Sequence, residues 1–300
     1  MPLGNDEAPP VIDAALIRRL LSAQLPGLAE LPLRRLTSAG SDNVIYRLGD
    51  DLAVRLPRGS WSTGQPRKEF QWLPRLAPEL PLPVPTPVAL GEPGEGYPWY
   101  WCVSRWLDGE IATIGGLADE AGAAAELAEF VEALHRIPAE PALEPGPHNS
   151  FIGAPLVRRD ASTRASIAQT GDVFDTAGLT EVWEKALAAP PWNGPPVWIH
   201  GDLHPGNLLT VDGRLSAVLD FGGLGAGDPA CDLLVAWTLL SASAREIFRT
   251  ALGVDDATWA RGRGYALSTG LNAYTAYAAT NPRIAANTGY QIAETLKEVR

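Results

Sequence analysis

The stretch Trp198–Trp237, WIHGDLHPGNLLTVDGRLSAVLDFGGLGAGDPACDLLVAW, is the most informative part of this chain. Three oxygen-bearing side chains stand at fixed intervals within it: Asp202 precedes Asn207 by five residues, and Asn207 precedes Asp220 by thirteen. The residues between the last two have the pattern of a short β-hairpin closed by an Asp-Gly turn. Such a hairpin is short enough to bring Asn207 and Asp220 together on one wall of a cleft.

These three side chains are of the types that phosphoryl transfer needs. The reaction needs a carboxylate that accepts or orients the proton of the attacking hydroxyl, and oxygen ligands that hold Mg²⁺ against the phosphates. Asp202 would be that catalytic base. Asn207 offers a neutral carbonyl oxygen and Asp220 a charged one, and Mg²⁺ prefers such hard ligands. These three residue types are therefore compatible with a phosphoryl-transfer site that holds Mg²⁺.

Four segments of this stretch, in the same order, resemble the aminoglycoside phosphotransferase family. They are HGDLHPGN at 200–207, LDFG at 219–222, GDP at 227–229 and Asp232. That family shares its fold and catalytic parts with choline kinases and, more distantly, with protein kinases. The resemblance implies a protein-kinase-like bilobal α/β (α+β) fold. Residues 1–106 would form a small β-sheet N-terminal lobe, and residues 107–300 a larger helical C-terminal lobe.

The resemblance also implies nucleotide-binding residues in the N-terminal lobe. Ser41 lies where the first hairpin of the family closes over the phosphates, so its hydroxyl and nearby backbone amides would contact them. The family usually carries a lysine on the third strand, paired with a glutamate on the following helix. Here the matching strand position is Arg55, and Glu69 is its expected partner. Because the planar fork of an arginine differs from the point charge of a lysine, Lys68 or Arg58 is an alternative.

By the same resemblance, the strand Trp101–Leu107 forms the hinge between the lobes. Backbone groups of Arg105 and Leu107 would face the edge of a purine base. Any purine can pair with backbone groups, so both ATP and GTP stay open as phosphate donors. Trp106, beside the hinge, is the tryptophan that we expect to touch nucleotide or substrate.

Hydrophobic periodicity and turn residues supply the other expected elements. In the first lobe they predict a helix over 11–30, a hairpin of strands 43–48 and 52–56, a helix over 67–76, an edge strand within 78–98 and a strand over 100–106. In the second they predict an Ala-rich helix over 117–136 and helices from 231 to 300. One β-rich patch, 197–219, interrupts them, and its hairpin strands are 208–211 and 215–219.

Composition indicates a globular protein, which we expect to be soluble and cytoplasmic. Hydrophobic residues form 46% of the chain and charged residues 20%, which is typical of a protein with a substantial core. We expect no membrane span, since no run approaches the required ~18 apolar residues. The N-terminus MPLGNDEAPP lacks the basic and apolar regions of a signal peptide. Cys102 and Cys231 lie far apart in the sequence, which fits a reducing compartment.

The net charge and its distribution along the chain indicate which classes of ligand the protein can bind. The net charge of −11 argues against a nucleic-acid surface, because phosphate backbones recruit basic patches. Residues 1–110 hold 13 acids and 11 bases, while residues 111–300 hold 22 acids and 13 bases. An acidic C-terminal part would attract a cationic ligand, although it would equally serve solubility. The expected partners are a nucleoside triphosphate and a small hydroxylated substrate, and nothing in the sequence indicates an oligomeric state.

Several polar residues within Trp198–Trp237 can be interpreted either as structural or as functional. By resemblance to the family, His200 holds the catalytic loop through hydrogen bonds rather than acting as a base. His204 would either touch substrate or stand in solvent. Asp228 and Asp232 could bind metal, but we expect them to cap a helix and anchor the loop that follows Asp220.

Other functions are also compatible with parts of the pattern. The alternation His200-x-Asp202-x-His204 could bind Zn²⁺ or Fe²⁺ in a hydrolase, although it gives Asn207 and Asp220 no purpose. A catalytically silent kinase-fold binding protein is another alternative. Family resemblance favours an aminoglycoside or another hydroxylated natural product as acceptor, and macrolides, sugars and choline-like alcohols stay open.

Overall fold

The computed structural model describes residues 11–36, 42–139 and 143–297. Contacts between residues divide the chain into two compact units. The N-terminal unit is Met1–Pro78 with Val84–Leu107, and the C-terminal unit is Glu79–Pro83 with Asp108–Arg300. The division after Leu107 lies one residue from the expected lobe boundary, but the short segment Glu79–Pro83 groups with the second unit.

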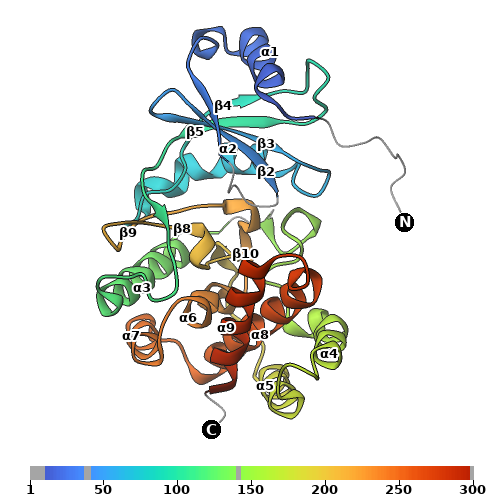
Figure 1. Cartoon of the computed structure of the whole chain (residues 1–300). Helices are drawn as coiled ribbons and strands as arrows, with labels where there is room; N and C mark the ends of the chain where they lie inside the picture. Colours follow the sequence, from blue (N-terminus) through green and yellow to red (C-terminus); the bar gives the residue numbers. More distant parts are fainter. Residues whose placement is uncertain (1–10, 37–41, 140–142, 298–300) are drawn as a thin grey trace. The chain divides into compact units, whose positions relative to one another are not determined.

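The N-terminal unit is built on one antiparallel sheet with two helices (Figure 1). Alternation along β3 assigns its two faces. Val54 and Leu56 join the core that α1 contributes to, whereas Arg55 points to the face where α2 lies. The strand order is β1-β2-β3-β5-β4, and the bounds are α1 Ala14–Gln24, β1 Leu33–Arg35, β2 Asn43–Leu48, β3 Leu52–Pro57, α2 Gln65–Leu76, β4 Pro87–Gly91 and β5 Trp101–Arg105.

Most expected elements of this unit are confirmed. The hairpin matches to within one residue, because two runs rich in apolar and β-branched side chains flank the Gly49-Asp50-Asp51 turn. The first helix is shorter than the predicted 11–30. Asp13 caps it, and it ends at Gln24 because Pro26 disfavours helical backbone at the residue before it. A single 3₁₀ turn, η1 Pro26–Leu28, covers the rest.

The C-terminal unit is mainly helical, with two small sheets. The helices are α3 Glu120–Arg136, α4 Asp160–Gln169, α5 Thr176–Ala188, α6 Val235–Thr238, α7 Ala242–Leu252, α8 Asp256–Tyr277 and α9 Pro282–Lys297. The sheets are β6-β8-β9, of Glu110–Ile111, Leu208–Val211 and Arg214–Val218, and β7-β10, of Val197–Ile199 and Gly225–Gly227. The expected fold class, a small antiparallel sheet followed by a larger helical part, is confirmed.

Two short strands lie outside the single β patch that the sequence predicts. Strand β6 has two residues and pairs with β8, and β10 is the tripeptide Gly-Ala-Gly paired with β7. Glycine and alanine are depleted in strands, so no local pattern marks β10. It is extended because Gly225 lies opposite Ile199 in the register of β7.

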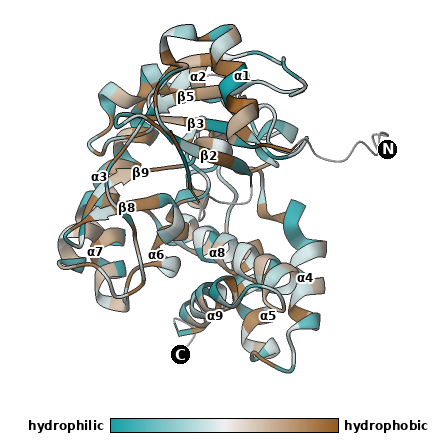
Figure 2. Cartoon of the chain, turned by 45° about the horizontal axis from the view of Figure 1, so that its top comes forward, coloured by the Kyte–Doolittle hydropathy of each residue, from teal (hydrophilic) through white to brown (hydrophobic). Residues whose placement is uncertain are grey.

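Helix α8 is the central helix of the C-terminal unit, packed against α4, α5, α9 and the 3₁₀ segment η8, Pro229–Leu234. Three of its buried residues are glycines, Gly262, Gly264 and Gly270. Many residues of the helix have intermediate hydropathy, so it is largely pale in Figure 2. A Cβ on Gly264 would lie 2.3 Å from the Cβ of Ala186, and one on Gly262 would lie 2.7 Å from a Leu233 methyl. Glycine at both positions lets α5 and η8 approach the axis of α8.

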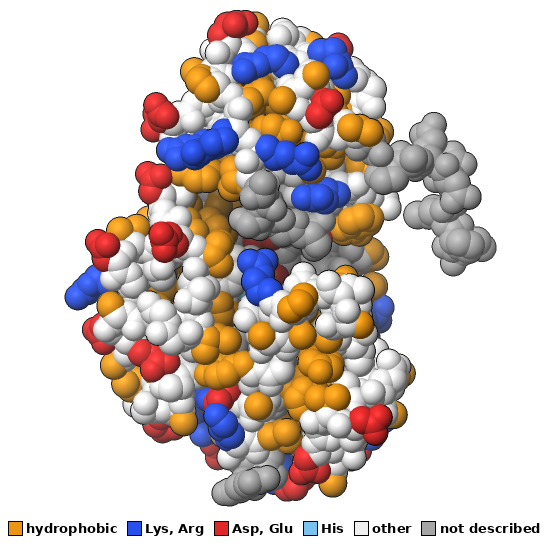
Figure 3. Space-filling model, viewed as in Figure 1, with side chains coloured by type: hydrophobic (Ala, Val, Ile, Leu, Met, Phe, Trp, Pro, Cys, Tyr) orange, Lys and Arg blue, Asp and Glu red, His pale blue; other side chains and the backbone are white. Residues whose placement is uncertain are grey.

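Charged side chains of both signs occur on the surface. On the face shown in Figure 3, acidic and basic side chains are present on the N-terminal unit and also on the C-terminal unit. Among the residues that the structure describes, no helix is long and apolar enough to cross a membrane.

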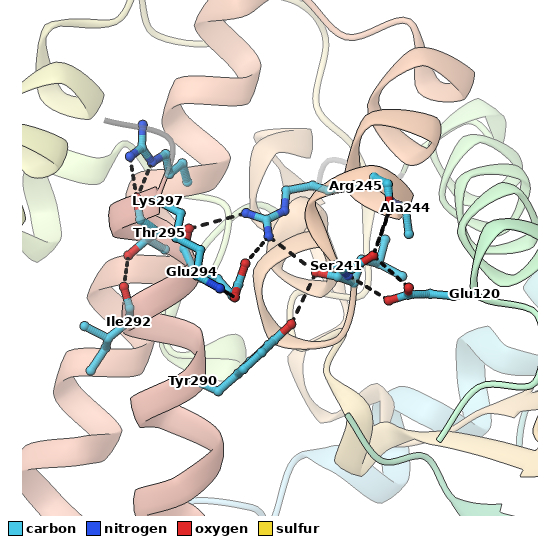
Figure 4. A network of polar contacts seen from close by, with 12 residues as sticks. Glu120, Ser241, Ala244, Arg245, Tyr290, Ile292, Glu294, Thr295 and Lys297 are labelled. Atoms are coloured by element: carbon cyan, nitrogen blue, oxygen red, sulfur yellow. Dashed lines mark hydrogen bonds and ion pairs between the residues drawn. The ribbon is translucent and has the colours of Figure 1, made fainter. Parts of the chain in front are cut away.

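A buried polar network joins α3, α7 and α9 (Figure 4). Arg245 on α7 pairs with Glu294 on α9, and their side chains are only 2% and 4% exposed. Arg245 also donates to the Leu240 carbonyl. Glu120 accepts hydrogen bonds from the backbone and hydroxyl of Ser241, both at 2.7 Å, which ties α3 to the start of α7. The network holds the last described helix to the rest of the unit.

We expect Glu294→Ala to destabilise the protein by about 3–5 kcal/mol, because it leaves the buried Arg245 charge uncompensated. The measurement is urea unfolding followed by tryptophan fluorescence. Glu181→Ala is the control: its partner Lys185 is exposed, so about 0–1 kcal/mol is expected. Equal losses in the two variants would contradict the buried pair as a stability determinant.

Candidate active site

The carboxylate of Asp202 lies in the loop between β7 and the 3₁₀ turn η6, Pro205–Asn207. Its side chain is about half exposed. The Asn207 amide nitrogen donates to the Asp202 carbonyl at 2.9 Å and to its Oδ2 at 3.0 Å. His204 Nε2 lies 3.5 Å from the same Oδ2. Two donors thus face Oδ2, so Oδ1 is the oxygen best placed to receive a further donor.

The neighbours of Asp202 keep it ionised. Although half of its side chain is exposed, the protein around the Asp202 carboxyl partly desolvates it, which by itself would raise its pKa. The His204 imidazole, together with His200 and the Asn207 amide, outweighs this effect and holds the pKa below its usual value. Burial opposes the charged form of His204 as well, yet the carboxylates of Asp202 and Asp220 raise the pKa of its imidazole. Asp202 is therefore a carboxylate at neutral pH, as a proton acceptor must be.

Asn207 and Asp220 are brought together by the hairpin, as the sequence predicts. Leu208 pairs with Val218 at the start of the hairpin, and the Leu219 amide donates to the Asn207 carbonyl at 2.8 Å. Asp220 follows with a left-handed backbone, φ 59°. Its Oδ1 accepts a hydrogen bond from the Gly222 amide at 3.1 Å. The backbone bond between Leu219 and Asn207 thus places Asn207, just before β8, next to the residue that precedes Asp220.

His200 connects the loop of Asp202 to the segment before Asp220. Its Nδ1 accepts from the Asp202 amide at 3.2 Å, so Nε2 carries the hydrogen and donates to the Leu219 carbonyl at 2.9 Å. The fully buried ring packs against Phe221, with centroids 4.7 Å apart. These contacts confirm the expected loop-holding role.

The hydrolase reading of the His-x-Asp-x-His pattern finds no support in this geometry. Both ring nitrogens of His200 are used in hydrogen bonds within the chain, and Nδ1 of His204 accepts from the Gly206 amide. In the described part of the chain, no group of three or more His, Cys, Asp or Glu side chains could hold a metal ion.

Asp232 anchors the loop that follows β7 and carries Asp202. Its fully buried carboxylate accepts from the Gly201 amide at 2.6 Å and the His200 amide at 3.1 Å, and His135 Nε2 lies 3.0 Å from it. Asp228 caps η8 through the Ala230 amide. The expected structural role is confirmed for Asp228 as a helix cap, whereas Asp232 anchors the loop that follows β7 and not the predicted loop after Asp220.

Three residues that bind Asp232, Asp228 or the loop itself were not predicted from the sequence. His135 lies in the last turn of α3, 97 residues before its partner Asp232. Arg261 on α8 grips both oxygens of Asp228, at 2.7 and 3.1 Å. Tyr265, also on α8, donates its hydroxyl to the Gly201 carbonyl at 3.1 Å. Each belongs to a helix remote in sequence from the motif, so local spacing gives no signal for them.

In the N-terminal unit, the predicted pairing of Arg55 with Glu69 is present. Nη1 of Arg55 on β3 lies 2.7 Å from Oε2 of Glu69 on α2, and both side chains are buried. The alternative Arg58 donates instead to the Asn43 carbonyl at 3.0 Å. Arg55 therefore takes the strand position of the family lysine, while the phosphate-binding role of this pair stays a prediction. Ser41 lies outside the described residues.

The hinge residues lie at the end of β5. The Arg105 amide donates to the Thr86 carbonyl at 2.9 Å, so the group that Arg105 can offer to a purine is its carbonyl. The Trp106 amide donates to the Asp51 carbonyl at 2.8 Å, and the Arg47 guanidinium lies 4.6 Å from the centroid of the Trp106 ring. Leu107 is the last residue of the unit. These bonds fix the hinge backbone, and its contact with nucleotide stays a prediction.

Comparisons with known proteins agree with this description. The model of the phosphotransferase enzyme family matches residues 34–265. An aminoglycoside 3'-phosphotransferase from Escherichia coli is 35% identical over 118 residues, which are 38% of this chain and 42% of that relative. The match thus spans only about two fifths of the length of this curated relative.

Solved structures resemble the whole chain. Wild-type aminoglycoside 2'-phosphotransferase-IIIa in complex with GDP is 19% identical, with a TM-score of 0.70 over 96% of this chain and 100% of that chain. The apoenzyme of macrolide 2'-phosphotransferase MphH from Brachybacterium faecium is 26% identical, with a TM-score of 0.55 over 90% and 98%. At 19% identity the first likeness is one of fold.

We expect Asp232→Asn to lower stability by at least about 2 kcal/mol, because one backbone amide of the loop then meets an amide nitrogen instead of an acceptor. Thermal and urea unfolding measure the change. Asp119→Asn is the matched control, since Asp119 caps the exposed start of α3 and asparagine caps equally well. A stability loss no larger than that of the control would count against Asp232 as the anchor.

Proposed function

The chain belongs to the phosphotransferase enzyme family, and on that basis we propose that it is a Mg²⁺-dependent small-molecule kinase. It transfers the γ-phosphate of ATP or GTP to a hydroxyl of an aminoglycoside or another hydroxylated antibiotic. The observation that carries the proposal is the arrangement of one loop and one hairpin. An ionised Asp202, the amide of Asn207 and the carboxylate of Asp220 lie together, joined by His200.

Asp202 is the catalytic base of the proposed reaction. The acceptor hydroxyl donates its hydrogen bond to Oδ1, since Asn207 and His204 already face Oδ2. Its oxygen attacks the γ-phosphorus in line, the bond from phosphorus to the β–γ bridging oxygen breaks, and the nucleoside diphosphate leaves. The hydroxyl proton passes to Asp202. Most of the rate enhancement comes from positioning and charge neutralisation rather than from covalent chemistry.

Asn207 and Asp220 fit a magnesium site. The Asn207 amide nitrogen is committed to two oxygens of Asp202, which leaves the amide oxygen as the group that a cation can bind. Asp220 adds a carboxylate from the neighbouring position of the hairpin. Hard oxygen donors of this kind suit Mg²⁺, which keeps further positions for phosphate oxygens and water. When bound, the ion would neutralise charge on the β- and γ-phosphates.

The N-terminal unit supplies the proposed nucleotide contacts. Arg55, held by Glu69, would contact phosphate oxygens, and the loop of Ser41 would close over them. The Arg105 carbonyl and the Leu107 amide would pair with the purine edge. This pairing fits adenine or guanine, and a solved relative holds GDP. A cytoplasmic setting agrees with the two buried free thiols, Cys102 and Cys231.

A macrolide is the second candidate acceptor. The likeness that supports it is the macrolide 2'-phosphotransferase MphH, which at 26% identity is nearer in sequence than the aminoglycoside 2'-phosphotransferase-IIIa at 19%. The excess of acids in residues 111–300 supports the polycationic aminoglycosides instead, because it raises the local concentration of cations. Either acceptor would make antibiotic resistance one role of the enzyme.

The deciding experiment is nucleotide consumption by the purified protein with Mg²⁺, against aminoglycosides, macrolides, sugars and small amino alcohols. Stimulation by one acceptor class, with phosphorylated product found by mass spectrometry, is the expected result. Mg²⁺-dependent nucleotide binding with no transfer to any acceptor would favour a catalytically silent kinase fold. A protein that binds no nucleotide would overturn the proposal.

We expect Asp202→Asn to lower kcat by roughly 10²–10⁴-fold, the usual contribution of a general base. The affinity for Mg²⁺-nucleotide changes little, because Asp202 acts on the acceptor. Steady-state kinetics and calorimetric nucleotide binding measure the two effects separately. An Asp202→Asn enzyme with near wild-type kcat would remove Asp202 from the mechanism.

Asp220→Asn is expected to act on nucleotide binding instead. Losing a charged ligand weakens Mg²⁺ binding, so the Kd for nucleotide in the presence of Mg²⁺ rises by about tenfold or more, while the Kd measured in EDTA stays near the wild-type value. The matched control is Asp212→Asn, an exposed residue at the tip of the same hairpin. Equal Mg²⁺ dependence in all three proteins would contradict the metal role of Asp220.

A further inference from the structure

The peptide group between Gly201 and Asp202 is held at both of its polar atoms. Its carbonyl, that of Gly201, accepts from the Tyr265 hydroxyl at 3.1 Å. Its N–H, that of Asp202, donates to His200 Nδ1 at 3.2 Å. The preceding N–H, that of Gly201, donates to Asp232 at 2.6 Å. Tyr265 on α8 and His200 in the loop itself therefore hold this peptide plane, and Asp232 in η8 holds the peptide plane before it.

This peptide needs such support because Gly201 is conformationally free. The residue has φ +80°, and a Cβ there would lie 2.4 Å from Cγ2 of Ile152, so only glycine fits. Glycine also leaves the following peptide plane free to rotate at little cost. Rotation of that plane moves the main chain of Asp202 and with it the carboxylate. Whatever holds the Gly201 carbonyl therefore controls the position of the base.

Tyr265 is itself rigid. It lies on α8, its side chain is buried, and the Arg159 guanidinium lies 5.0 Å from the centroid of its ring. Arg159 is fixed in turn by a 2.9 Å bond from its Nε to the Ser268 hydroxyl, one turn further along α8. Burial raises the pKa of the Tyr265 phenol well above its usual value, so the hydroxyl stays protonated and donates. The Tyr265 hydroxyl is therefore a donor of fixed position for the Gly201 carbonyl.

We propose that Tyr265 is a positioning residue for the catalytic base. Its hydroxyl locks the Gly201–Asp202 peptide, so that Oδ1 of Asp202 stays where the acceptor hydroxyl arrives. Tyr265 touches neither nucleotide nor acceptor, and it acts only through the loop. This role rests on the proposed function, in which Asp202 receives the proton. A displacement of the base by about 1 Å can lower the rate of such a reaction by about 10²-fold.

Tyr265→Phe removes the hydroxyl and keeps the ring, so the packing of α8 is preserved. Tyr97→Phe is the matched control. Tyr97 is also buried and also donates its hydroxyl to a backbone carbonyl, that of Pro57 at 2.9 Å, but it belongs to the N-terminal unit. The two substitutions remove the same kind of bond, so a general loss of stability affects both variants alike.

Two measurements test the proposal. With the acceptor found in the activity screen, we expect kcat of Tyr265→Phe to fall by about tenfold or more, with KM values for nucleotide and acceptor within about threefold of wild type. Hydrogen exchange followed by mass spectrometry, without substrate, should show faster exchange of amides in residues 200–204 and unchanged exchange in α3. Tyr97→Phe should retain wild-type kcat and wild-type exchange in the loop.

The two measurements also separate this proposal from the proposed function. A wild-type enzyme that phosphorylates no acceptor counts against the function, and the exchange experiment still decides whether Tyr265 holds the loop. Unchanged loop exchange in Tyr265→Phe overturns the positioning role. So does an unchanged kcat, or a fall in kcat that Tyr97→Phe reproduces.

Discussion

The buried carboxylate of Asp232 is the constraint on which the C-terminal unit depends. A fully buried charge is tolerated only when it is paired and hydrogen-bonded, and Asp232 meets this condition with the amides of His200 and Gly201 and with His135. These partners come from the loop after β7 and from α3, while Asp232 itself lies in η8. Satisfying one carboxylate therefore fixes where three elements meet. Asp202 lies in the loop after β7, which these contacts of Asp232 hold in place.

Sequence patterns predict the parts of this architecture that are local. The hairpin from Leu208 to Val218 brings Asn207 to Asp220 because a short turn leaves little choice of register, and the β2–β3 hairpin carries Arg55 opposite α2 for the same reason. Partners from distant helices could not be predicted. Tyr265 lies 64 residues from Gly201, and β10 has no strand-forming residues of its own. Contacts of this kind depend on how helices and strands far apart in the sequence pack together. Local patterns in a single sequence do not predict that packing.

The N-terminal unit shows how a departure from the family pattern is accommodated. An arginine at position 55 keeps a cation on the face of β3 that α2 covers, and its ion pair with Glu69 is shielded from water. Removing either partner would leave a buried charge, so the pair is expected to vary together or not at all. Arginine binds phosphate through a planar fork, whereas lysine binds as a point charge. If Arg55 binds phosphate as proposed, its contacts would therefore differ in geometry from those of a lysine.

Helix α8 divides into two halves with different capacities for evolutionary change. Its first half packs through Gly262 and Gly264 against α5 and η8, and any larger side chain there would separate elements that hold the catalytic loop. Its last turn, Tyr274–Tyr277, is only partly covered and ends at an exposed tyrosine. Substitutions in this last turn therefore meet fewer packing constraints than substitutions at Gly262 or Gly264, and they leave the packing of η8 behind the loop of Asp202 untouched.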